Sequence, residues 1–195
     1  MLGFAQILVA DYEDKLDADG RDALGEIMAN AKKMGALIDA LLSLSQMTRT
    51  SLIPEKVDLG AVARTVLAEL RAREPHRVVR ASIEDGLDAW IDPRLARALM
   101  ENLVGNAWKF SSQTPEAHIE VGAAHPIDGT DFFVRDNGAG FDMVYVSKLF
   151  TPFQRLHLPG TFDGTGIGLA TVHRIVQRHG GRIWAEGAVG RGATF

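Results

Sequence analysis

The residues best suited to chemistry lie in the stretch 101–110, which reads Glu-Asn-Leu-Val-Gly-Asn-Ala-Trp-Lys-Phe and has the apolar spacing of a helix. At about 100° per residue, Asn102, Asn106 and Lys109 fall within roughly 60° of one another at the edge of the apolar face, and Glu101 points away from them. Two amides and an ammonium group at such an edge cost desolvation energy unless something hydrogen-bonds them. A metal-bound polyphosphate would use all three groups, but a polar network between this helix and a loop explains them equally well.

A second candidate segment, residues 136–140, reads Asp-Asn-Gly-Ala-Gly and follows directly after a predicted strand. A buried carboxylate at Asp136 could accept a hydrogen bond from an exocyclic amine, and the glycines would let a flat ring approach the backbone. An ordinary turn that closes the strand has the same composition. Taken alone, this segment favours the turn.

A third segment, residues 163–170, reads Asp-Gly-Thr-Gly-Ile-Gly-Leu-Ala and leads into a predicted helix. A helix start with glycines offers free backbone N–H donors to phosphate groups. A dinucleotide-binding fold would need a strand directly before these glycines, and residues 152–159 do not have the pattern of one. That fold is therefore rejected, and the segment by itself is weak evidence for phosphate binding.

Two helices are expected to precede these segments. Residues 2–14 have a helical pattern, residues 17–20 form a polar turn, and a second helix of about 30 residues follows. Its apolar positions alternate three and four residues apart, as in a helical bundle: Leu24, Ile27, Ala31, Met34, Ile38, Leu41 and Ser45. The second helix is about 45 Å long and the first about 21 Å, so antiparallel pairing of the two leaves half of the second helix uncovered. Either another chain covers that half, or the sequence begins partway along the first helix.

A domain boundary is expected at residues 49–54, where a proline interrupts the helical pattern. We therefore divide the chain into a truncated antiparallel helical hairpin at 1–50, a linker at 51–56 and a second domain at 57–195.

The second domain is expected to alternate between strands and helices. Asp92 and Pro93 mark the start of its central helix as N-cap and first-turn proline, and a turn at Asp128-Gly129 joins two strands. The region of about 25 residues after Gly140 is long for a loop in a compact domain and is a candidate lid. The expected elements are strands at 57–58, 77–83, 88–91, 118–124, 130–136, 182–188 and 193–195, the last cut short, and helices at 59–74, 93–110 and 166–179. This order predicts an α+β fold, a two-layer α/β sandwich with helices on one face of a mixed sheet.

The composition limits the partners that the chain could have. Its 195 residues are 46% hydrophobic and 24% charged, with a diffuse net charge of -4 and no cysteine. No basic patch suggests nucleic-acid binding, and no apolar run approaches the roughly 18 residues of a membrane span. The N-terminus lacks the features of a signal peptide. We expect a cytoplasmic segment without membrane contact, with any membrane anchor of the parent protein outside it.

Together, in this order and spacing, the segments resemble the catalytic and ATP-binding domain of sensor histidine kinases, within the ATPase superfamily that includes gyrase and the MutL proteins. The resemblance covers roughly residues 55–195, and residues 2–50 resemble the dimerisation and phosphotransfer hairpin of the same family. The shared motifs are the N box at 102–110, the first glycine box at 136–140, the F box at 150–153, the second glycine box at 163–168 and a final glycine motif at 190–194.

The resemblance implies ATP and Mg²⁺ as ligands and assigns roles to individual residues. Asn106 would bind the magnesium, Asn102 and Lys109 would contact phosphates, and Asp136 would accept from the adenine amino group. Arg155 would contact the terminal phosphate, so that Arg155 and Lys109 are the implied catalytic residues. The other residues implied to contact the nucleotide are Phe110, Gly138, Gly140, Gly164, Thr165, Gly166, Gly168, Leu169 and Thr194.

The chain departs from the family in one respect that bears on activity. The family's phosphoacceptor is a histidine early in the first helix, and this chain has no histidine before His76. We expect that the chain does not autophosphorylate, and that the acceptor precedes Met1 by about ten residues in the parent protein. The resemblance further implies a homodimer through the hairpin and a response regulator receiver domain as partner.

Two other functions compete with the kinase. The first is an ATP hydrolase of the same superfamily, whose members use a glutamate at the position of Asn102 to activate water. An amide cannot act as that base, and Glu101 is turned away by a helical step of about 100°. The second is a non-catalytic nucleotide-binding dimerisation module.

Overall fold

The structure, a computed structural model, describes residues 2–12, 15–49, 51–124, 130–156, 161–162 and 164–195, with only part of the side chains in the first two helices. It divides into two compact units, Met1–Arg49 and Thr50–Phe195. None of the described helices has the length and apolar content to cross a lipid bilayer.

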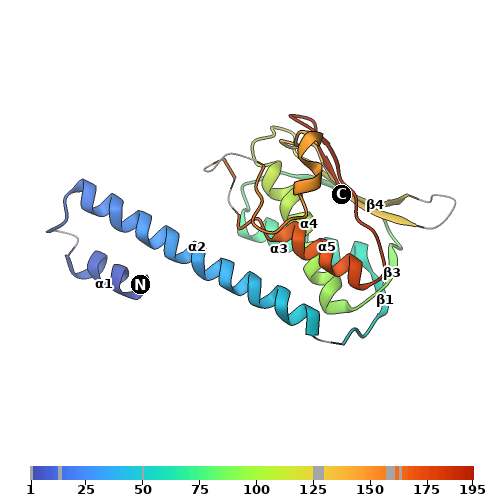
Figure 1. Ribbon diagram of the computed structural model, residues 1–195. Coiled ribbons are helices and arrows are strands. Elements are labelled where there is room, and N and C mark those ends of the chain that lie inside the picture. Colours follow the sequence, from blue (N-terminus) through green and yellow to red (C-terminus); the bar gives the residue numbers. More distant parts are fainter. Residues whose placement is uncertain (1, 13–14, 50, 125–129, 157–160, 163) are drawn as a thin grey trace. The chain divides into compact units, whose positions relative to one another are not determined.

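The first unit consists of two helices, α1 (Leu2–Tyr12) and α2 (Ala18–Arg49). Helix α1 folds back along the first part of α2 and buries Ala5 and Leu24 (Figure 1). The predicted turn at 17–20 is instead the start of α2, because the carboxylate of Asp17 accepts from the backbone N–H of Gly20 at 2.8 Å. Farther along α2, large apolar side chains are exposed: Ile27, Met34, Ile38, Leu41 and Leu42.

The second unit is built on a five-stranded sheet in the order β2-β4-β5-β7-β6. Strands β2 and β4 are parallel and the other neighbours are antiparallel, so the sheet is mixed. Two further strands, β1 and β3, form a separate antiparallel pair. The bounds are β1 (Glu55–Asp58), β2 (Arg80–Ile83), β3 (Asp88–Ile91), β4 (His118–Ala124), β5 (Asp131–Asp136), β6 (Glu186–Ala188) and β7 (Gly192–Thr194).

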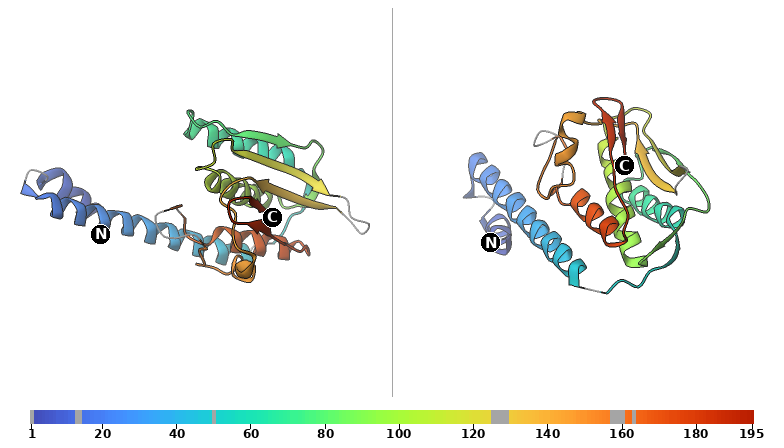
Figure 2. Two further views of the ribbon diagram at one scale, coloured as in Figure 1. Left: turned by 90° about the horizontal axis from the view of Figure 1, so that it is seen from above. Right: turned by 45° about the vertical axis from the view of Figure 1, so that its right-hand side comes forward.

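Helices α3 (Leu59–Arg73), α4 (Pro93–Phe110) and α5 (Gly168–Arg178) form a layer on one face of the sheet, with α4 in the middle (Figure 2). Most of the sheet residues that face this layer are apolar, and Val121 of β4 lies opposite Val134 of β5, each buried. On the other face, Glu120 pairs with Arg135 at 3.1 Å. The predicted α+β fold with helices on one face of a mixed sheet is confirmed.

The predicted start of α4 is confirmed in detail. The carboxylate of Asp92 accepts from the backbone N–H of Arg94 at 3.1 Å, and Pro93 occupies the first turn, where its missing N–H is not needed. Among the buried residues of α4, Leu99 and Leu103 form part of the core beneath the sheet. This capped, anchored helix carries the polar stripe to which the family resemblance assigns metal and phosphate contacts.

Two predicted elements are shorter than expected. Arg77, placed in a strand from the sequence, instead donates to the carbonyl of Trp108 and to the hydroxyl of Ser111, which closes the end of α4. The strand predicted at 182–188 is limited to β6, because its ladder with β7 has only three residue pairs.

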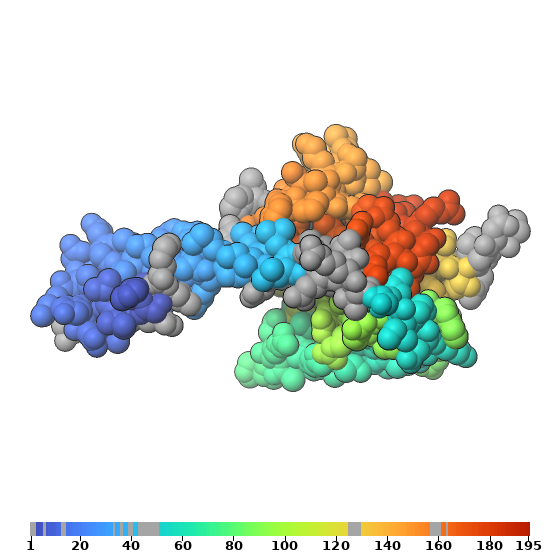
Figure 3. Space-filling view, turned by 60° about the horizontal axis from the view of Figure 1, so that its bottom comes forward, coloured from blue at the N-terminus to red at the C-terminus, as the bar shows by residue number. Residues whose placement is uncertain are grey.

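The region after Gly140 also differs from the prediction of an irregular loop. It contains a 3₁₀ helix, η2 (Met143–Lys148), which Asp142 caps through the backbone N–H of Val144 at 2.9 Å. We call residues 143–166 the lid segment. In the space-filling view it projects from the surface beside α5 (orange and red, Figure 3). The turn predicted at Asp128-Gly129 lies outside the described residues.

Candidate functional site

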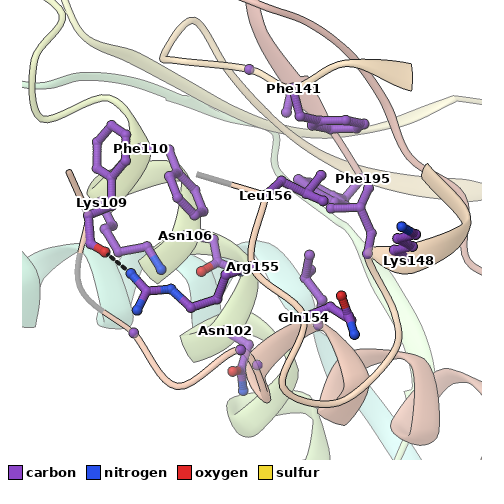
Figure 4. Close-up of a pocket in the computed structure, with 18 of the residues that line it drawn as sticks. Asn102, Asn106, Lys109, Phe110, Phe141, Lys148, Gln154, Arg155, Leu156 and Phe195 are labelled. Carbon is purple, nitrogen blue, oxygen red and sulfur yellow. Dashed lines mark hydrogen bonds between the residues drawn. The ribbon is translucent and has the colours of Figure 1, made fainter. Parts of the chain in front are cut away.

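A cavity of about 260 Å³ opens between α4, the lid segment, the start of α5 and the end of β5. The structure brings most of the predicted site residues together around it, and the exceptions are Gly138 and Thr194. The predicted residues that line it are Asn102, Asn106, Lys109, Phe110, Asp136, Gly140, Arg155, Gly164, Thr165, Gly166, Gly168 and Leu169. Figure 4 shows Asn106, Lys109 and Arg155 gathered on one side, and the rings of Phe141 and Phe195 on the other.

Helix α4 supplies the polar wall of the cavity, as the helical spacing predicts. Asn102 donates through Nδ2 to the carbonyl of Ala98, one turn earlier, at 2.7 Å. Its Oδ1 then faces the first residue of α5, where a Cβ on Gly168 would lie 2.6 Å from that oxygen. A side chain at Gly168 would therefore displace the Asn102 amide from its present position, so glycine here leaves room for that amide.

Asp136 ends β5 and is only 5% exposed. Its Oδ1 accepts from the backbone N–H of Gly138 at 2.8 Å. Burial raises the pKa of Asp136 to about 6, although the backbone hydrogen bonds from Gly138 and Ala193 act in the opposite direction. Above that pH the group is a buried carboxylate at the edge of the cavity, able to accept hydrogen bonds from a ligand.

Asn137 holds the loop that begins at Asp136. Its side-chain oxygen accepts from the backbone N–H of His118 at 2.8 Å, and its Nδ2 donates to the carbonyl of Glu116 at 2.8 Å. Both amide groups are used within the protein, so this side chain fixes the loop and leaves ligand contact to Asp136.

Phe153 and Gly166 meet at the base of the lid segment. The backbone N–H of Phe153 donates to the carbonyl of Gly166 at 2.9 Å, and both residues have positive φ angles, 66° and 74°. The sequence predicts that α5 begins at Gly166. A positive φ angle at Gly166 does not belong to a right-handed helix, so α5 begins at Gly168 instead. Glycine tolerates such a φ angle, whereas a phenylalanine holds it only where surrounding contacts impose it.

Arg155 projects from the lid segment into the cavity (Figure 4). Its Nη2 donates to the carbonyl of Phe162 at 2.5 Å, and the ring of Phe162 packs edge-on against Phe110 with 5.1 Å between centroids. Among the described residues that line the cavity, Lys109, Lys148 and Arg155 are cationic and Asp136 alone is acidic. The cavity therefore suits a ligand that carries several negative charges.

Residues 91–195 match the family model of histidine kinase-, DNA gyrase B- and HSP90-like ATPases. The chain belongs to this family. It is 33% identical to cyanobacterial phytochrome A of Nostoc sp. over 98% of its own length and 25% of the relative's. It is 34% identical to the methanogenesis regulatory histidine kinase FilI of Methanothrix harundinacea over 97% of its own length and 21% of the relative's. The chain thus spans about a quarter of the length of these relatives.

Solved structures show the same fold. Full-length ShkA in complex with AMPPNP superimposes with a TM-score of 0.67 at 24% identity, over 100% of this chain and 41% of that one. The histidine kinase AdeS of Acinetobacter baumannii superimposes with a TM-score of 0.65 at 20% identity, over 99% of this chain and 90% of that one. The predicted resemblance to the ATP-binding catalytic domain of sensor histidine kinases is confirmed.

Within this kinase-type domain, the structure leaves two predicted residues outside the cavity. Gly138 donates its backbone N–H to Asp136, and a Cβ at this position would clash with the carbonyl oxygen of Phe110. Thr194 pairs in register with Arg135, and its hydroxyl accepts from that side chain at 3.1 Å on the opposite face of the sheet from Asp136. Ala193, its neighbour, takes the place beside the cavity. The alternation of faces along a strand places Thr194 on the face opposite Asp136 once the register is known.

The structure adds residues that sequence reasoning missed. They are Phe141, Lys148, Leu149, Gln154, Leu156, Phe162, Ala193 and Phe195. Most belong to the lid segment, where no helical or strand period indicates which side chains turn inward. The F box, 150–153, has no residue at the cavity wall: Phe150 instead packs against His173 of α5, with 5.6 Å between ring centroids.

Proposed function

We propose that the second unit binds ATP with Mg²⁺ and holds the γ-phosphate for transfer to a histidine of a dimerisation domain, from which a response regulator receives it. The observation that carries the proposal is the cavity itself, whose lining includes two amides, an ammonium group, a guanidinium, a buried carboxylate and aromatic rings. Asn106, Lys109 and Arg155 lie on one side of it, and the rings of Phe141 and Phe195 lie on the other. This division suits a molecule with a flat base at one end and a polyphosphate at the other.

At the base end, Asp136 supports selection of adenine. An ionised carboxylate only accepts hydrogen bonds, so it matches an exocyclic amine and opposes a carbonyl oxygen at the same place. The walls near it include Phe141 and Ala193, which offer apolar surface to the ring.

At the phosphate end, the start of α5 supplies backbone donors. Its N-cap, Ile167, has no side chain that can cap the helix, so the first N–H groups remain available to a phosphate. Lys109 from α4 and Arg155 from the lid segment bring positive charge to the same side. These groups would orient the γ-phosphate and stabilise the charge that develops on transfer.

The donors present fit a metal that is shared with the phosphates. Within the described part of the chain, no three acidic or histidine side chains converge to hold an ion by themselves. Mg²⁺ needs few protein ligands when phosphates and water complete its shell, and the Asn106 side chain lines the cavity as a hard oxygen donor. Bound at Asn106, Mg²⁺ would offset the negative charge of the phosphates during transfer.

The structure favours transfer over hydrolysis. Asn102 occupies the position where a hydrolase would need a base, and its amide cannot accept a proton. Glu101 pairs with Arg97 at 2.8 Å and is not among the described residues that line the cavity. Among the described residues that line the cavity, Asp136 is the only carboxylate, and it lies at the end of β5, where it is assigned to the adenine base.

The relatives support a signalling role for the parent protein. They include phytochromes, a regulatory histidine kinase and adaptive-response sensory kinases. We propose that the parent dimerises through α2, works in the cytoplasm and passes its phosphate to a response regulator.

Calorimetry with Mg²⁺-ATP tests the proposal on the whole chain. Asn102→Ala should weaken ATP binding about ten- to a hundredfold, because a hydrogen bond to a charged phosphate is lost. Glu101→Ala, one residue away on the same helix, is the matched control and should leave affinity unchanged. Absence of ATP binding, or equal effects of the two substitutions, would refute the assignment.

A further inference from the structure

Asp92 lies where three parts of the second unit meet. Its side chain is 1% exposed, and its Oδ2 accepts from the backbone N–H of Ile53 at 3.2 Å. Its Oδ1 caps α4 through the backbone N–H of Arg94, and the Arg94 guanidinium covers both oxygens at 3.2 and 2.9 Å. The backbone N–H of Asp92 donates to Nε2 of His179 at 3.1 Å. One residue thus contacts the segment before β1, the start of α4 and the end of α5.

The segment before β1 is held to Asp92 by backbone groups. Strand β1 pairs with β3 so that Glu55 lies opposite Ile91, and the bond from Ile53 continues this attachment by one more contact. The side chain of Ile53 is 61% exposed and contributes little packing. Within residues 51–54, the backbone N–H of Ile53 makes the described hydrogen bond to Asp92.

His179 completes the connection to α5. It is the C-cap residue of that helix, and its Nδ1 lies 2.8 Å from the carbonyl of Ile175. Nδ1 must donate to that carbonyl, which leaves Nε2 as the acceptor for the N–H of Asp92. Both ring nitrogens are thus committed, one to each helix.

The second half of α4 and the start of α5 form the phosphate side of the cavity. Asn102 follows Asp92 by ten residues, about 15 Å along α4, and α5 runs about 16 Å from Gly168 to its end. Helices of this length move as rigid elements, so a displacement at the Asp92–His179 contact must also displace their cavity ends.

We propose that Asp92 and His179 are positioning residues, through which the segment 51–54 sets the spacing of α4 and α5 at the phosphate side of the cavity. In the parent protein this segment follows the long helix α2 in sequence, so the contact would allow a change there to alter nucleotide affinity. The affinity part rests on the proposed ATP binding; the positioning of the helices does not.

Hydrogen exchange on the full chain separates positioning from simple packing. In His179→Asn the short amide can still reach the Ile175 carbonyl but not Asp92, whereas in His179→Gln the longer side chain can place an oxygen where Nε2 was. We expect His179→Asn to speed exchange in the middle of both α4 and α5 about three- to tenfold, and to weaken Mg²⁺-ATP binding by a similar factor. His179→Gln should return both the exchange rates and the Mg²⁺-ATP affinity to those of the unmutated chain.

The second pair of variants changes the hydrogen bond from Ile53 to the Asp92 carboxylate. Ile53→Pro removes the N–H donor, and Ile53→Ala keeps it as the control. Ile53→Pro should speed exchange in α5, far along the chain from the substitution, and its effect combined with His179→Asn should be smaller than the sum because both act through Asp92.

Faster exchange confined to the neighbourhood of each substitution, or additive effects, would overturn the proposal. If His179→Asn fails to fold, the Ile53 pair decides the question alone. If the unmutated chain does not bind ATP, the proposed function fails, while the exchange pattern still tests the positioning.

Discussion

Asp136 is the residue whose protonation state bears most directly on nucleotide recognition. Because its pKa is raised to about 6, the carboxylate that would accept from adenine is lost as the pH falls through that value. ATP affinity of the unmutated chain should therefore decline below pH 6. Asp136→Asn should cost about 1–3 kcal/mol in ATP binding and remove both this pH dependence and the preference over GTP. Calorimetry between pH 5 and pH 8 measures all three, and equal ATP and GTP affinities in the unmutated chain would contradict the assignment.

The same carboxylate has the opposite effect on folding. A raised pKa means that the native state binds the proton more tightly than the unfolded chain, so this contribution to stability is present below about pH 4 and is lost as the pH rises through 6. Asp136→Asn, which carries no charge, should stabilise the nucleotide-free chain by at most about 3 kcal/mol at pH 7.5 and by little at pH 4. Urea unfolding at the two pH values tests this, and a gain of equal size at both would show that charge burial is not the cause.

Asn106 is the only residue assigned to the metal. Asn106→Ala should bind ATP with a much smaller response to Mg²⁺, because the substitution leaves only water in place of the amide oxygen. Calorimetry with and without Mg²⁺ gives the comparison, with Glu101→Ala as the control on the outer side of the same helix. An unchanged response to Mg²⁺ would show that the metal role is misassigned.

At the scale of elements, α2 presents an apolar surface that α1 does not cover. Met34, Ile38, Leu41 and Leu42 are each about half exposed. Burying a side chain of this size contributes about 1.5–3 kcal/mol, so four together favour association. The proposed homodimer through α2 would bury them.

Leu41→Glu should shift the chain from dimer to monomer in sedimentation experiments, because a charge would enter the apolar surface. Lys32→Gln is the matched control: it changes the charge by the same amount about 180° around the helix and should leave the dimer intact. An unmutated chain that is monomeric at high micromolar concentration would rule out this surface as an interface.

At the scale of the whole molecule, we expect the chain to bind ATP without phosphorylating itself. The first histidine in the sequence is His76. Among the described histidines, His118 bonds to Ser82, His173 packs against Phe150 and His179 bonds to Asp92. We expect no acid-labile label on the chain after incubation with γ-labelled ATP, even where calorimetry shows binding. Acid-labile label mapped to any of the six histidines would contradict this expectation.

The sequence alone determined the features that depend on local periodicity and chemistry. A helical repeat puts Asn102, Asn106 and Lys109 on one stripe, and a cap followed by proline fixes where that helix begins. The position of Asp136 at the end of a strand follows from local pattern in the same way. The resemblance to sensor histidine kinases rests on the order and spacing of these local motifs along the chain.

Only the tertiary structure decided which of these groups meet. The register of β5 with β7 turns Thr194 away from the cavity. The part of the lid segment after η2 brings in Leu156 and Phe162, because contacts and not a repeat set the directions of these side chains. The raised pKa of Asp136 arises from burial by elements distant in sequence. The contact between Asp92 and His179 joins residues 87 positions apart, a separation at which no local pattern can indicate a hydrogen bond.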